Sequence, residues 1–432
     1  MNARDYAFDL IAAAHLPGWD ELKSRPPRVP EDPRDRGLGE AIAKSVIKNL
    51  LLLRHAIGHY TGRRLKEIDA PVQAVLAIGL AQMRFLDRVP APAAVDEAVE
   101  QAKRKKLGRA AGFVNAALRR ATREPDLPLP PRSDAVAYAE LALSHPRDVF
   151  RRFAEWLGTE GALRLCEKNN TEPPTILRLR TGWSDEWAAD TLMALGTHIK
   201  ARPHEWIGWA VVQGATEQDF AFWAAEGIAQ VQDPTSASVV RKMDLYYEGL
   251  RVLDRCCGVG TKTLQIAEAV GPDGRVVAVD PSKPRIARLR RSLAERGFAN
   301  VEPLAVGMMA DAGEAGAGTF DRILIDVPCS NSGVLIRRPE ARYRQSAGDL
   351  RSLEALQKRI VGDTLDRLAA GGLLVYSTCS VWPEENDAIV AWIAEQRADF
   401  ELIEQATTLP SIDPDPTRHH DGGFVAVFRR RK

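Results

Sequence analysis

The stretch RVLDRCCGVGTKT, residues 251–263, combines a short apolar run, a turn with two glycines and the start of a helix. Gly258 and Gly260 allow the backbone to turn tightly and to approach a ligand closely. The helix that follows would direct its N-terminal amides at that ligand. The turn matches neither G-x-G-x-x-G nor G-x-x-x-x-G-K-[ST], so it lacks the dinucleotide and P-loop signatures. It predicts a strand–loop–helix unit with a ligand at the loop.

The same alternation of strand and helix continues to either side of this unit along the chain. The further apolar runs are RVVAVD (275–280), DRILID (321–326) and GLLVYST (372–378), and the helical stretches include SKPRIARLRRSLAERG (282–297) and DLRSLEALQKRIVGDTLDRLAAG (349–371). This alternation predicts a doubly wound α/β domain with a mainly parallel sheet. Ligands of such sheets bind beyond the carboxyl ends of the strands. The loops after the four apolar runs are therefore the predicted active site.

The loop after the second apolar run contains an acidic residue, Asp280. A carboxylate at this place can accept hydrogen bonds from a ribose diol. Alternatively, Asp280 stands before Pro281 simply as a helix-capping residue. Together with the glycine loop, it fits a cofactor that contains adenosine.

The loops after the third and fourth runs contain Cys329 and Cys379, with Asp326 three residues before the first cysteine. A cysteine taken alone is most often a small buried hydrophobe. Two thiols and a carboxylate at one edge of a sheet instead favour a catalytic site. Methylation of carbon 5 of a pyrimidine needs a thiolate that adds at carbon 6 and a base that removes the carbon 5 proton. Methylation of nitrogen needs no such nucleophile, and its usual D/N-P-P-Y/F/W loop is replaced by Asp-Val-Pro-Cys.

Composition sets the broader limits. The 432 residues are 45% hydrophobic and 27% charged, which is typical of a globular chain of two or three domains. No run approaches 18 apolar residues, and the N-terminal stretch contains acidic residues, so we expect a cytoplasmic protein without membrane segments. Five cysteines without a C-x-x-C pair indicate reduced thiols and no metal site.

Residues 1–125 show helical periodicity, and the proline-rich stretch EPDLPLPPRSD (124–134) predicts a stiff, extended connection. We predict a helical domain over 1–125, a linker over 126–134, a small α+β domain over 135–240 and the α/β domain over 241–432. Residues 1–125 contain 22 Lys/Arg against 15 Asp/Glu, a net charge of +7, with four consecutive cations at 103–106. Such a patch suits a polyanion, although a charge run can also be a solvated helix face.

Several motifs resemble those of a known family over almost the whole chain. VQDPTSAS (231–238), DRCCGVGTKT (254–263), DVPCSNSGVLIRRPEARYR (326–344) and YSTCSVWPEEND (376–387) are similar to the ordered motifs of the RsmB/Sun (Fmu) group of RNA cytosine-5 methyltransferases. The N-terminal third resembles the NusB-type RNA-binding domain, and the middle segment resembles the small RNA-binding domain of this group. The resemblance implies a Rossmann-like class I methyltransferase domain, S-adenosylmethionine as methyl donor, and a cytosine of small-subunit (16S) ribosomal RNA as substrate. We further expect a monomer.

The resemblance also implies roles for individual residues. Cys379 corresponds to the nucleophile, Cys329 to the cysteine that assists release, and Asp326 to the aspartate between cofactor and target base. The ribose-binding acid corresponds to Asp280 and a further cofactor contact to Arg285. The cofactor loop corresponds to Cys256, Cys257, Gly258, Val259, Gly260, Thr261 and Lys262.

The chain departs from the family pattern at three places. The usual loop is C-A-A-P-G-G-K-T, and Thr261 replaces its second glycine with a residue whose Cβ would resist a positive φ. The usual Gly-Asp after the third strand is Gly307-Met308, which leaves Asp311 as a candidate replacement, and Ile336 stands where an arginine is usual. Two other functions therefore stay open. One is an RNA-binding ribosome-assembly factor with a degenerate cofactor site, and the other is a DNA cytosine-5 methyltransferase with its nucleophile at Cys329.

Overall fold

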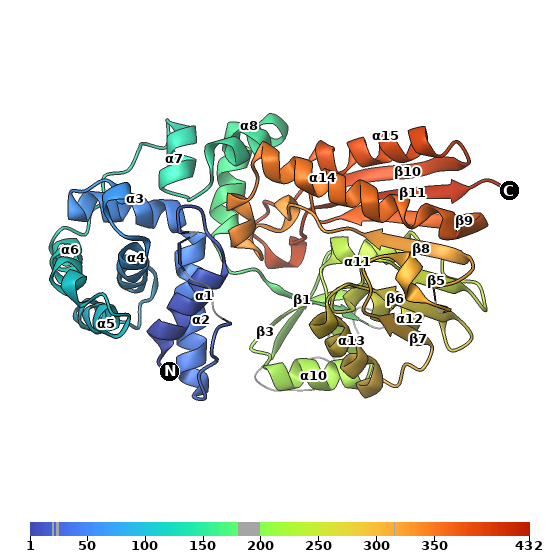
Figure 1. Ribbon diagram of the computed structural model, residues 1–432, viewed down its shortest axis with the longest axis horizontal. Coiled ribbons are helices and arrows are strands. Elements are labelled where there is room, and N and C mark those ends of the chain that lie inside the picture. The colour runs from blue at the N-terminus through green and yellow to red at the C-terminus, as the bar shows by residue number, and fades with distance from the viewer. Residues whose placement is uncertain (20, 23–25, 180–198, 315) are drawn as a thin grey trace. The chain divides into compact units, whose positions relative to one another are not determined.

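The computed structural model describes residues 1–432 except 20, 23–25, 180–198 and 315 (Figure 1). The chain divides into two units. The first comprises Met1–Glu172 and Leu335–Arg344, and the second comprises Pro173–Val334 and Gln345–Lys432. Within the described residues, no helix combines the length and the apolar composition that a membrane span requires.

The units follow other boundaries than the predicted domains. Residues 135–172 of the predicted small domain belong to the first unit, and only the part from residue 173 belongs to the second. Residues 180–198 of that predicted domain lie outside the described part of the chain. The ten residues 335–344, expected within the α/β domain, also belong to the first unit.

The first unit is helical, as the periodicity of residues 1–125 predicts. Its helices are α1 (Ala3–Ala13), α2 (Pro33–Lys48), α3 (Leu50–Thr61), α4 (Ala70–Phe85), α5 (Ala91–Arg104), α6 (Ala111–Arg123), α7 (Ala135–Leu141) and α8 (Arg147–Asn169), with 3₁₀ turns η1 (Leu65–Glu67), η2 (Gly108–Ala110) and η5 (Pro339–Tyr343). Helix α4 is apolar on nearly all sides and packs against α1, α2, α3, α5 and α6. Gly79 permits this packing, because a Cβ there would lie 2.7 Å from Leu118 Cδ1.

The proline-rich stretch has no helix or strand before α7, and its first half lies against the helical unit. Tyr60 Oη donates to the carbonyl of Glu124 at 2.9 Å, and Arg84 donates to the carbonyl of Pro125 at 3.1 Å. Leu127 is buried in the core of the unit. These contacts fix the course of its first half, and the stretch ends in a turn in which the amide of Asp134 donates to the carbonyl of Pro131 at 2.9 Å.

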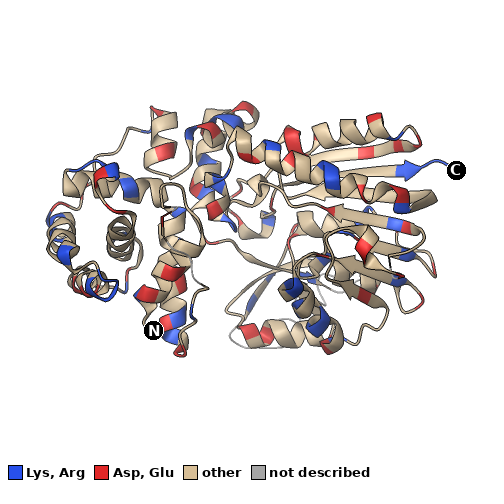
Figure 2. Cartoon of the chain, in the orientation of Figure 1, with Lys and Arg blue, Asp and Glu red and all other residues tan. Residues whose placement is uncertain are grey.

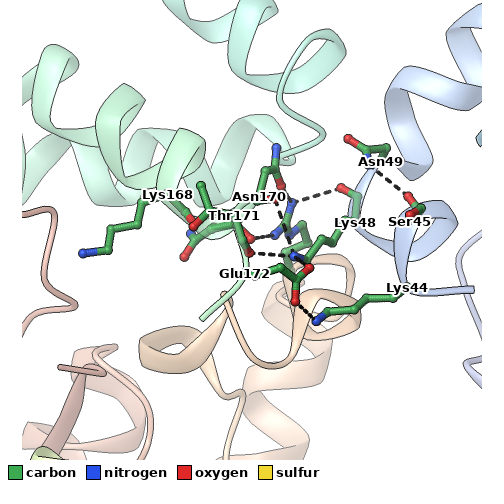
Figure 3. Close-up of polar contacts among 10 residues, drawn as sticks. Lys44, Ser45, Lys48, Asn49, Lys168, Asn170, Thr171 and Glu172 are labelled. Atoms are coloured by element: carbon green, nitrogen blue, oxygen red, sulfur yellow. Dashed lines mark hydrogen bonds and ion pairs between the residues drawn. The ribbon is translucent and has the colours of Figure 1, made fainter. Parts of the chain in front are cut away.

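Two buried cations tie residues 335–344 and the end of α8 to α2. Arg342 is fully buried and donates to Asn170 Oδ1 at 2.8 Å and to the carbonyl of Lys48 at 3.2 Å. Lys48 Nζ donates to the carbonyl of Thr171 at 2.6 Å and to Glu172 at 2.9 Å. Figure 3 shows Glu172 between Lys48 and Lys44, and both lysines contact its carboxylate. Because a buried cation needs oxygen partners, these contacts hold the segment in place.

The cationic run 103–106 in the helical unit is largely neutralised. Lys103 pairs with Glu100 at 2.7 Å, Arg104 with Asp5 at 2.9 Å and Lys105 with Asp9 at 2.9 Å. A run whose charges are balanced on its own surface attracts a polyanion less than its sequence suggests.

The second unit begins with a four-stranded antiparallel sheet in the order β2-β3-β1-β4. Leu177 of β1 lies on the sheet face that Trp223 of α10 covers. Its neighbour Ile176 lies on the opposite face, which Ala237 of α11 covers. Its elements are β1 (Thr175–Leu179), β2 (Lys200–Pro203), β3 (Trp209–Gln213), α10 (Glu217–Ala225), β4 (Ala229–Val231) and α11 (Pro234–Arg241).

The rest of the second unit is the predicted α/β fold, with a seven-stranded sheet in the order β10-β11-β9-β8-β5-β6-β7. Strands β5 to β9 pair in parallel, and only β10 and β11 run antiparallel to their neighbours. The strands are β5 (Arg251–Asp254), β6 (Arg275–Val279), β7 (Val301–Leu304), β8 (Phe320–Asp326), β9 (Leu368–Thr378), β10 (Phe400–Thr408) and β11 (Gly423–Arg430). The helices are α12 (Thr261–Val270), α13 (Lys283–Glu295), α14 (Ala347–Gly362) and α15 (Asp387–Gln396), with 3₁₀ turns η3 (Met309–Ala312), η4 (Ser332–Val334), η6 (Leu365–Arg367), η7 (Pro383–Glu385) and η8 (Pro416–Arg418).

The helix predicted over 349–371 ends earlier in the structure than the sequence pattern suggests. Helix α14 stops at Gly362, and β9 already begins at Leu368, which pairs with Phe320 of β8. Ile323 and Leu324 of β8 contribute to cores on opposite faces of the sheet. Because both faces are buried, sheet pairing outweighs the helical periodicity of the residues before β9.

Candidate active site

The loops that follow β5, β6, β8 and β9 meet at one edge of the large sheet. Strand β5 lies between β6 and β8, so successive strands are added on one side of β5 and then on the other. A crevice forms at the carboxyl ends of the strands where the strand order reverses in this way. The four loops predicted to carry the chemistry are the loops at this crevice.

The glycine loop after β5 adopts a conformation that needs both of its glycines. Gly258 has φ 57° and Gly260 has φ 94°. A Cβ at Gly260 would lie 2.3 Å from Leu289 Cδ1, so a side chain is excluded there by space as well as by conformation. Thr261 is the first residue of α12. The expectation that Thr261 would have to resist a positive φ was wrong, because Gly258 and Gly260 occupy those positions.

Asp280, after β6, is buried and accepts hydrogen bonds from its own chain. Its carboxylate accepts from the amide of Gly258 at 3.2 Å and from the amide of Ser282 at 2.8 Å. Arg285 lies 3.4 Å from the same carboxylate. The residue thus supports the entry into α13 and at the same time faces the glycine loop. Both interpretations of Asp280 from the sequence are compatible with this geometry.

The thiols of Cys329 and Cys379 lie together, with a distance of 3.2 Å between their Sγ atoms. The hydrogen bond to Cys379, together with burial, raises the pKa of Cys329 well above its usual value. Cys379 Sγ also lies 3.2 Å from Asn331 Oδ1. The two predicted cysteines therefore form one dithiol pair.

An ion pair lies beside the dithiol pair. Lys262 Nζ is 2.7 Å from Asp326 Oδ2, and Ser377 Oγ donates to Asp326 Oδ1 at 2.6 Å. Burial lowers the pKa of Lys262, but the charge and the hydrogen bond of Asp326 outweigh it, so that the pKa is raised. Cys379, when ionised, would raise it further. Lys262 is therefore a cation paired with Asp326, and it lines the same cavity as Cys379.

A small cavity opens beside these groups. Lys262, Asp326 and Cys379 line one part of it, and Thr235, Asp421 and Phe424 belong to its other lining residues. Cys379 is partly accessible, whereas Cys329 is buried and does not belong to the lining. Of the two thiols, Cys379 is the one that a substrate in this cavity would meet first.

Comparison with known proteins places the chain in a family. Residues 246–427 match the family described as 16S rRNA methyltransferase RsmB/F, and residues 1–123 match the NusB family. Ribosomal RNA small subunit methyltransferase B of Pseudomonas putida is 33% identical over 415 residues, which cover 93% of this chain and 91% of that protein. The chain belongs to the RsmB/F family of 16S rRNA methyltransferases.

A further relative and two solved structures are also similar to the chain. The probable ribosomal RNA small subunit methyltransferase B of Bacillus subtilis is 28% identical and covers 85% of the chain and 82% of its own length. The crystal structure of PH0851 superimposes with a TM-score of 0.77 at 20% identity and covers 100% of this chain and 98% of its own. The structure of NSun6 from Pyrococcus horikoshii with SFG has a TM-score of 0.50 at 18% identity, and covers 66% of this chain and 98% of its own. The two structures support the fold alone.

S-adenosylmethionine is the cofactor of this family and its fold. The residues present fit it, because the glycine loop is open at Gly258, where a Cβ would meet no atom within 4 Å, and Asp280 offers a carboxylate beside that loop. Val259 and Met308 are apolar side chains that are each 41% exposed. Asp311, the candidate replacement for the missing aspartate, is exposed within η3.

A buried ion pair that the sequence did not indicate supports the loop of Met308. Arg255 donates to the carbonyl of Gly307 at 2.6 Å and pairs with Asp363 at 2.9 Å. Asp363 in turn accepts from the amide of Met309 at 2.8 Å. The backbone on both sides of Met308 is thereby fixed in this RsmB/F member without an aspartate at that position.

The two loop cysteines are poor nucleophiles. Burial raises the pKa of Cys256 to about 12 and raises the pKa of Cys257 further. Both stay protonated near neutral pH, so their predicted role is limited to forming the cofactor loop.

The sequence did not indicate Ser377 or Asn331. Ser377 donates a hydrogen bond to Asp326, and Asn331 accepts one from Cys379. Asn331 has φ 60°, a conformation that asparagine tolerates better than most residues. The run Ser330-Asn331-Ser332 after the Pro-Cys pair was the available signal, because such residues form turns that expose a polar side chain.

The expectation that no metal is bound stays a prediction. Asp233, His419 and Asp421 are buried and offer ligand atoms that lie within 4.8 Å of one another. Hydrogen bonds already occupy some of these ligand atoms; for example, the amide of Asp421 donates to the Asp233 carboxylate at 3.1 Å.

Asp254, at the end of β5, makes the stability of the second unit depend on pH. Its carboxyl is buried, and burial raises its pKa from 3.8 to about 7 in spite of the hydrogen bond from Thr263 at 2.7 Å. Between these two values the folded state holds a proton that the unfolded state has lost. The free energy of unfolding should therefore fall as the pH rises from about 4 to about 7, by roughly 4 kcal/mol at most. Urea titrations at pH 5 and pH 8 measure this difference in the free energy of unfolding. The difference should be smaller in Asp254→Asn than in the wild type, and an equal difference would contradict the role of Asp254.

Proposed function

We propose that the chain transfers a methyl group from S-adenosylmethionine to carbon 5 of a cytosine in 16S ribosomal RNA, through a covalent bond between Cys379 and carbon 6. The observation that carries the proposal is the dithiol pair, of which Cys379 alone lines the cavity beside Lys262 and Asp326. A methyltransferase that modifies nitrogen or oxygen has no use for two adjacent thiols at the base.

The first step is the attack of the Cys379 thiolate on carbon 6. The Sγ–carbon 6 bond forms, and the electron pair of the carbon 5–carbon 6 double bond becomes available at carbon 5. Lys262 lies near enough to balance the charge of the thiolate and of Asp326. Asp326, held by Lys262 and Ser377, would orient the base through its N3 edge.

When bound, S-adenosylmethionine would supply an electrophilic methyl group: the electron pair at carbon 5 would form the new carbon–carbon bond while the methyl–sulfur bond breaks, leaving S-adenosylhomocysteine. Cys329, after losing its own proton to water, takes the proton from carbon 5. The electron pair of that carbon–hydrogen bond restores the double bond as the Cys379–carbon 6 bond breaks. The raised pKa of Cys329 makes its thiolate a strong base for this step.

The test is methyl transfer with a chemical readout. The full chain is incubated with methyl-labelled S-adenosylmethionine and 16S ribosomal RNA. The RNA is then digested to nucleosides, which are separated and identified by mass spectrometry. We expect label in 5-methylcytidine. Label in a methylated amino group, or none, would overturn the proposal. A parallel reaction with duplex DNA tests the alternative that the protein is a DNA cytosine-5 methyltransferase. A calorimetric titration with S-adenosylmethionine that shows no heat of binding would favour the other alternative, an RNA-binding assembly factor.

Helix α13 offers a cationic surface for the RNA backbone. This helix has five cations, Lys283, Arg285, Arg288, Arg290 and Arg291, with Glu295 as its one acid. Figure 2 shows the positive charges along it. Its apolar residues Ile286, Leu289 and Leu293 face the core, and among the described residues Arg288 and Arg291 have no ion-pair partner. Free cations of this kind bind phosphates and release counterions.

Reversal of two of these charges should weaken RNA binding. For Arg288→Glu/Arg291→Glu we expect a lower affinity for 16S ribosomal RNA, and a slope of log Kd against log salt that is smaller by about 2. Fluorescence anisotropy between 50 and about 300 mM salt measures both. The control is Arg429→Glu/Arg431→Glu, the same charge change at the end of β11, where both residues are exposed. Equal losses in both variants would mean that α13 is not the contact surface.

A further inference from the structure

Glu385 is a fully buried carboxylate behind the dithiol pair, in the 3₁₀ turn η7 that follows β9. It accepts four hydrogen bonds. Oε1 accepts from the amide of Ser330 at 2.8 Å and from Gln357 Nε2 at 3.1 Å. Oε2 accepts from the hydroxyl of Ser330 at 2.5 Å and from the hydroxyl of Ser380 at 2.6 Å.

The residues that Glu385 binds are those next to the two thiols. Ser330 follows Cys329, and Ser380 follows Cys379. Gln357 of α14, which binds the same carboxylate, also donates to the carbonyl of Pro328 at 3.0 Å, directly before Cys329. One carboxylate therefore connects the loops of both cysteines, which come from two neighbouring strands, β8 and β9.

The surrounding bonds complete a network that is closed to solvent. Ser332 Oγ lies 2.9 Å from Ser380 Oγ and accepts from the amide of Val381 at 2.9 Å. The amide of Gly333 donates to the carbonyl of Cys379 at 2.9 Å. Networks of this kind fix distances closely, because each partner is buried and has no water to replace a lost bond.

The free energy needed to bury this carboxylate indicates a role beyond packing. Within the described part of the chain no Lys or Arg pairs with Glu385, so the charge is compensated by neutral donors alone. A buried carboxylate without a cation is expensive, and apolar side chains of similar size would suffice for packing.

We propose that Glu385 is a positioning residue that holds the two thiols at their mutual distance and keeps Cys329 in place for the release step. This inference rests on the proposed function as far as release is concerned. The positioning itself can be tested without methyl transfer, because it concerns the distance between two sulfur atoms.

The test uses Glu385→Gln, which keeps the shape of the side chain and removes its charge, and Glu384→Gln as the matched control one residue away. A bifunctional thiol reagent that becomes fluorescent on bridging two close thiols reports the Cys329–Cys379 pair. Cys329→Ser and Cys379→Ser provide the background. We expect the bridging rate of Glu385→Gln to fall by about tenfold, the effect of about 1.4 kcal/mol, and that of Glu384→Gln to stay at the wild-type value. An unchanged rate in Glu385→Gln overturns the inference.

The second measurement is the partition between covalent adduct and methylated product. Glu385→Gln should accumulate the denaturant-resistant RNA adduct, as a partial version of Cys329→Ser. A wild-type partition would overturn the role in release. If Glu385→Gln shows no cooperative unfolding transition, Ser330→Ala/Ser380→Ala removes two of the hydroxyl bonds and leaves the carboxylate, and its bridging rate must fall for the inference to stand. Failure of the proposed function would appear separately, as the absence of adduct in Cys329→Ser.

Discussion

Replacement of Cys379 by serine should abolish methyl transfer to 16S ribosomal RNA, whereas replacement of Cys329 by serine should trap the protein on the RNA. The expected loss for Cys379→Ser is at least about 10³-fold, because serine is a far weaker nucleophile than a thiolate. Cys379 is the thiol that lines the cavity, and it lies near the cation of Lys262. Without it, no bond to carbon 6 can form.

Cys329→Ser leaves the nucleophile in place and removes the base for the last step. A serine hydroxyl does not ionise in the accessible pH range and cannot take the carbon 5 proton. The adduct between Cys379 and the methylated base should therefore persist, and appear as a protein–RNA band that survives denaturing electrophoresis.

The control is Cys166→Ala in the helical unit, where burial raises the thiol pKa to about 12. It should neither lose activity nor form the band. If the adduct appeared with Cys379→Ser and not with Cys329→Ser, the two roles would have to be exchanged, and the chain would resemble the DNA methyltransferase alternative in its choice of nucleophile.

Replacement of Lys262 by methionine should lower kcat by about 10² to 10³-fold, the usual effect of removing one charged group that stabilises developing charge. The lysine is held 2.7 Å from Asp326 and near Cys379. Methionine fills a similar volume without the charge, so that Asp326 keeps its bond from Ser377 but the thiolate loses its cation.

Steady-state rates with 16S ribosomal RNA measure the effect, and Lys262→Arg is the matched variant that keeps the charge. We expect Lys262→Arg to retain much more activity than Lys262→Met. The side chain of Asp326 is 29% exposed, so water can solvate it after the substitution and the fold should survive. Equal rates in the two variants would exclude an electrostatic role of Lys262.

The α/β fold, the cofactor loop and the two cysteines could be predicted from sequence because their signals are local. Four apolar runs alternate with amphipathic helices, and a chemically reactive residue stands at the end of each run or within three residues of it. The rule that parallel strands end at one edge was therefore enough to bring Cys329, Cys379 and Asp326 together. Lys262 was named only through the family resemblance, as the last residue of the cofactor loop.

Other features depend on contacts between residues far apart in the chain. The ten residues 335–344 belong to the helical unit because Arg342 finds oxygen partners on α2 and at the end of α8, and no pattern within the segment indicates those partners. The cations at 103–106 form a strong local signal, but the acids that neutralise two of them, Asp5 and Asp9, are more than 90 positions away.

The sequence by itself determined the class of fold, the family resemblance and the residues proposed to react, because periodicity, turn residues and motif spacing are properties of neighbouring residues. Only the tertiary structure decided which thiol meets the cavity, how Arg255 and Asp363 support the loop of Met308, and that Glu385 connects the two cysteine loops. These are distances between side chains brought together from separate strands, and they depend on how the whole second unit packs.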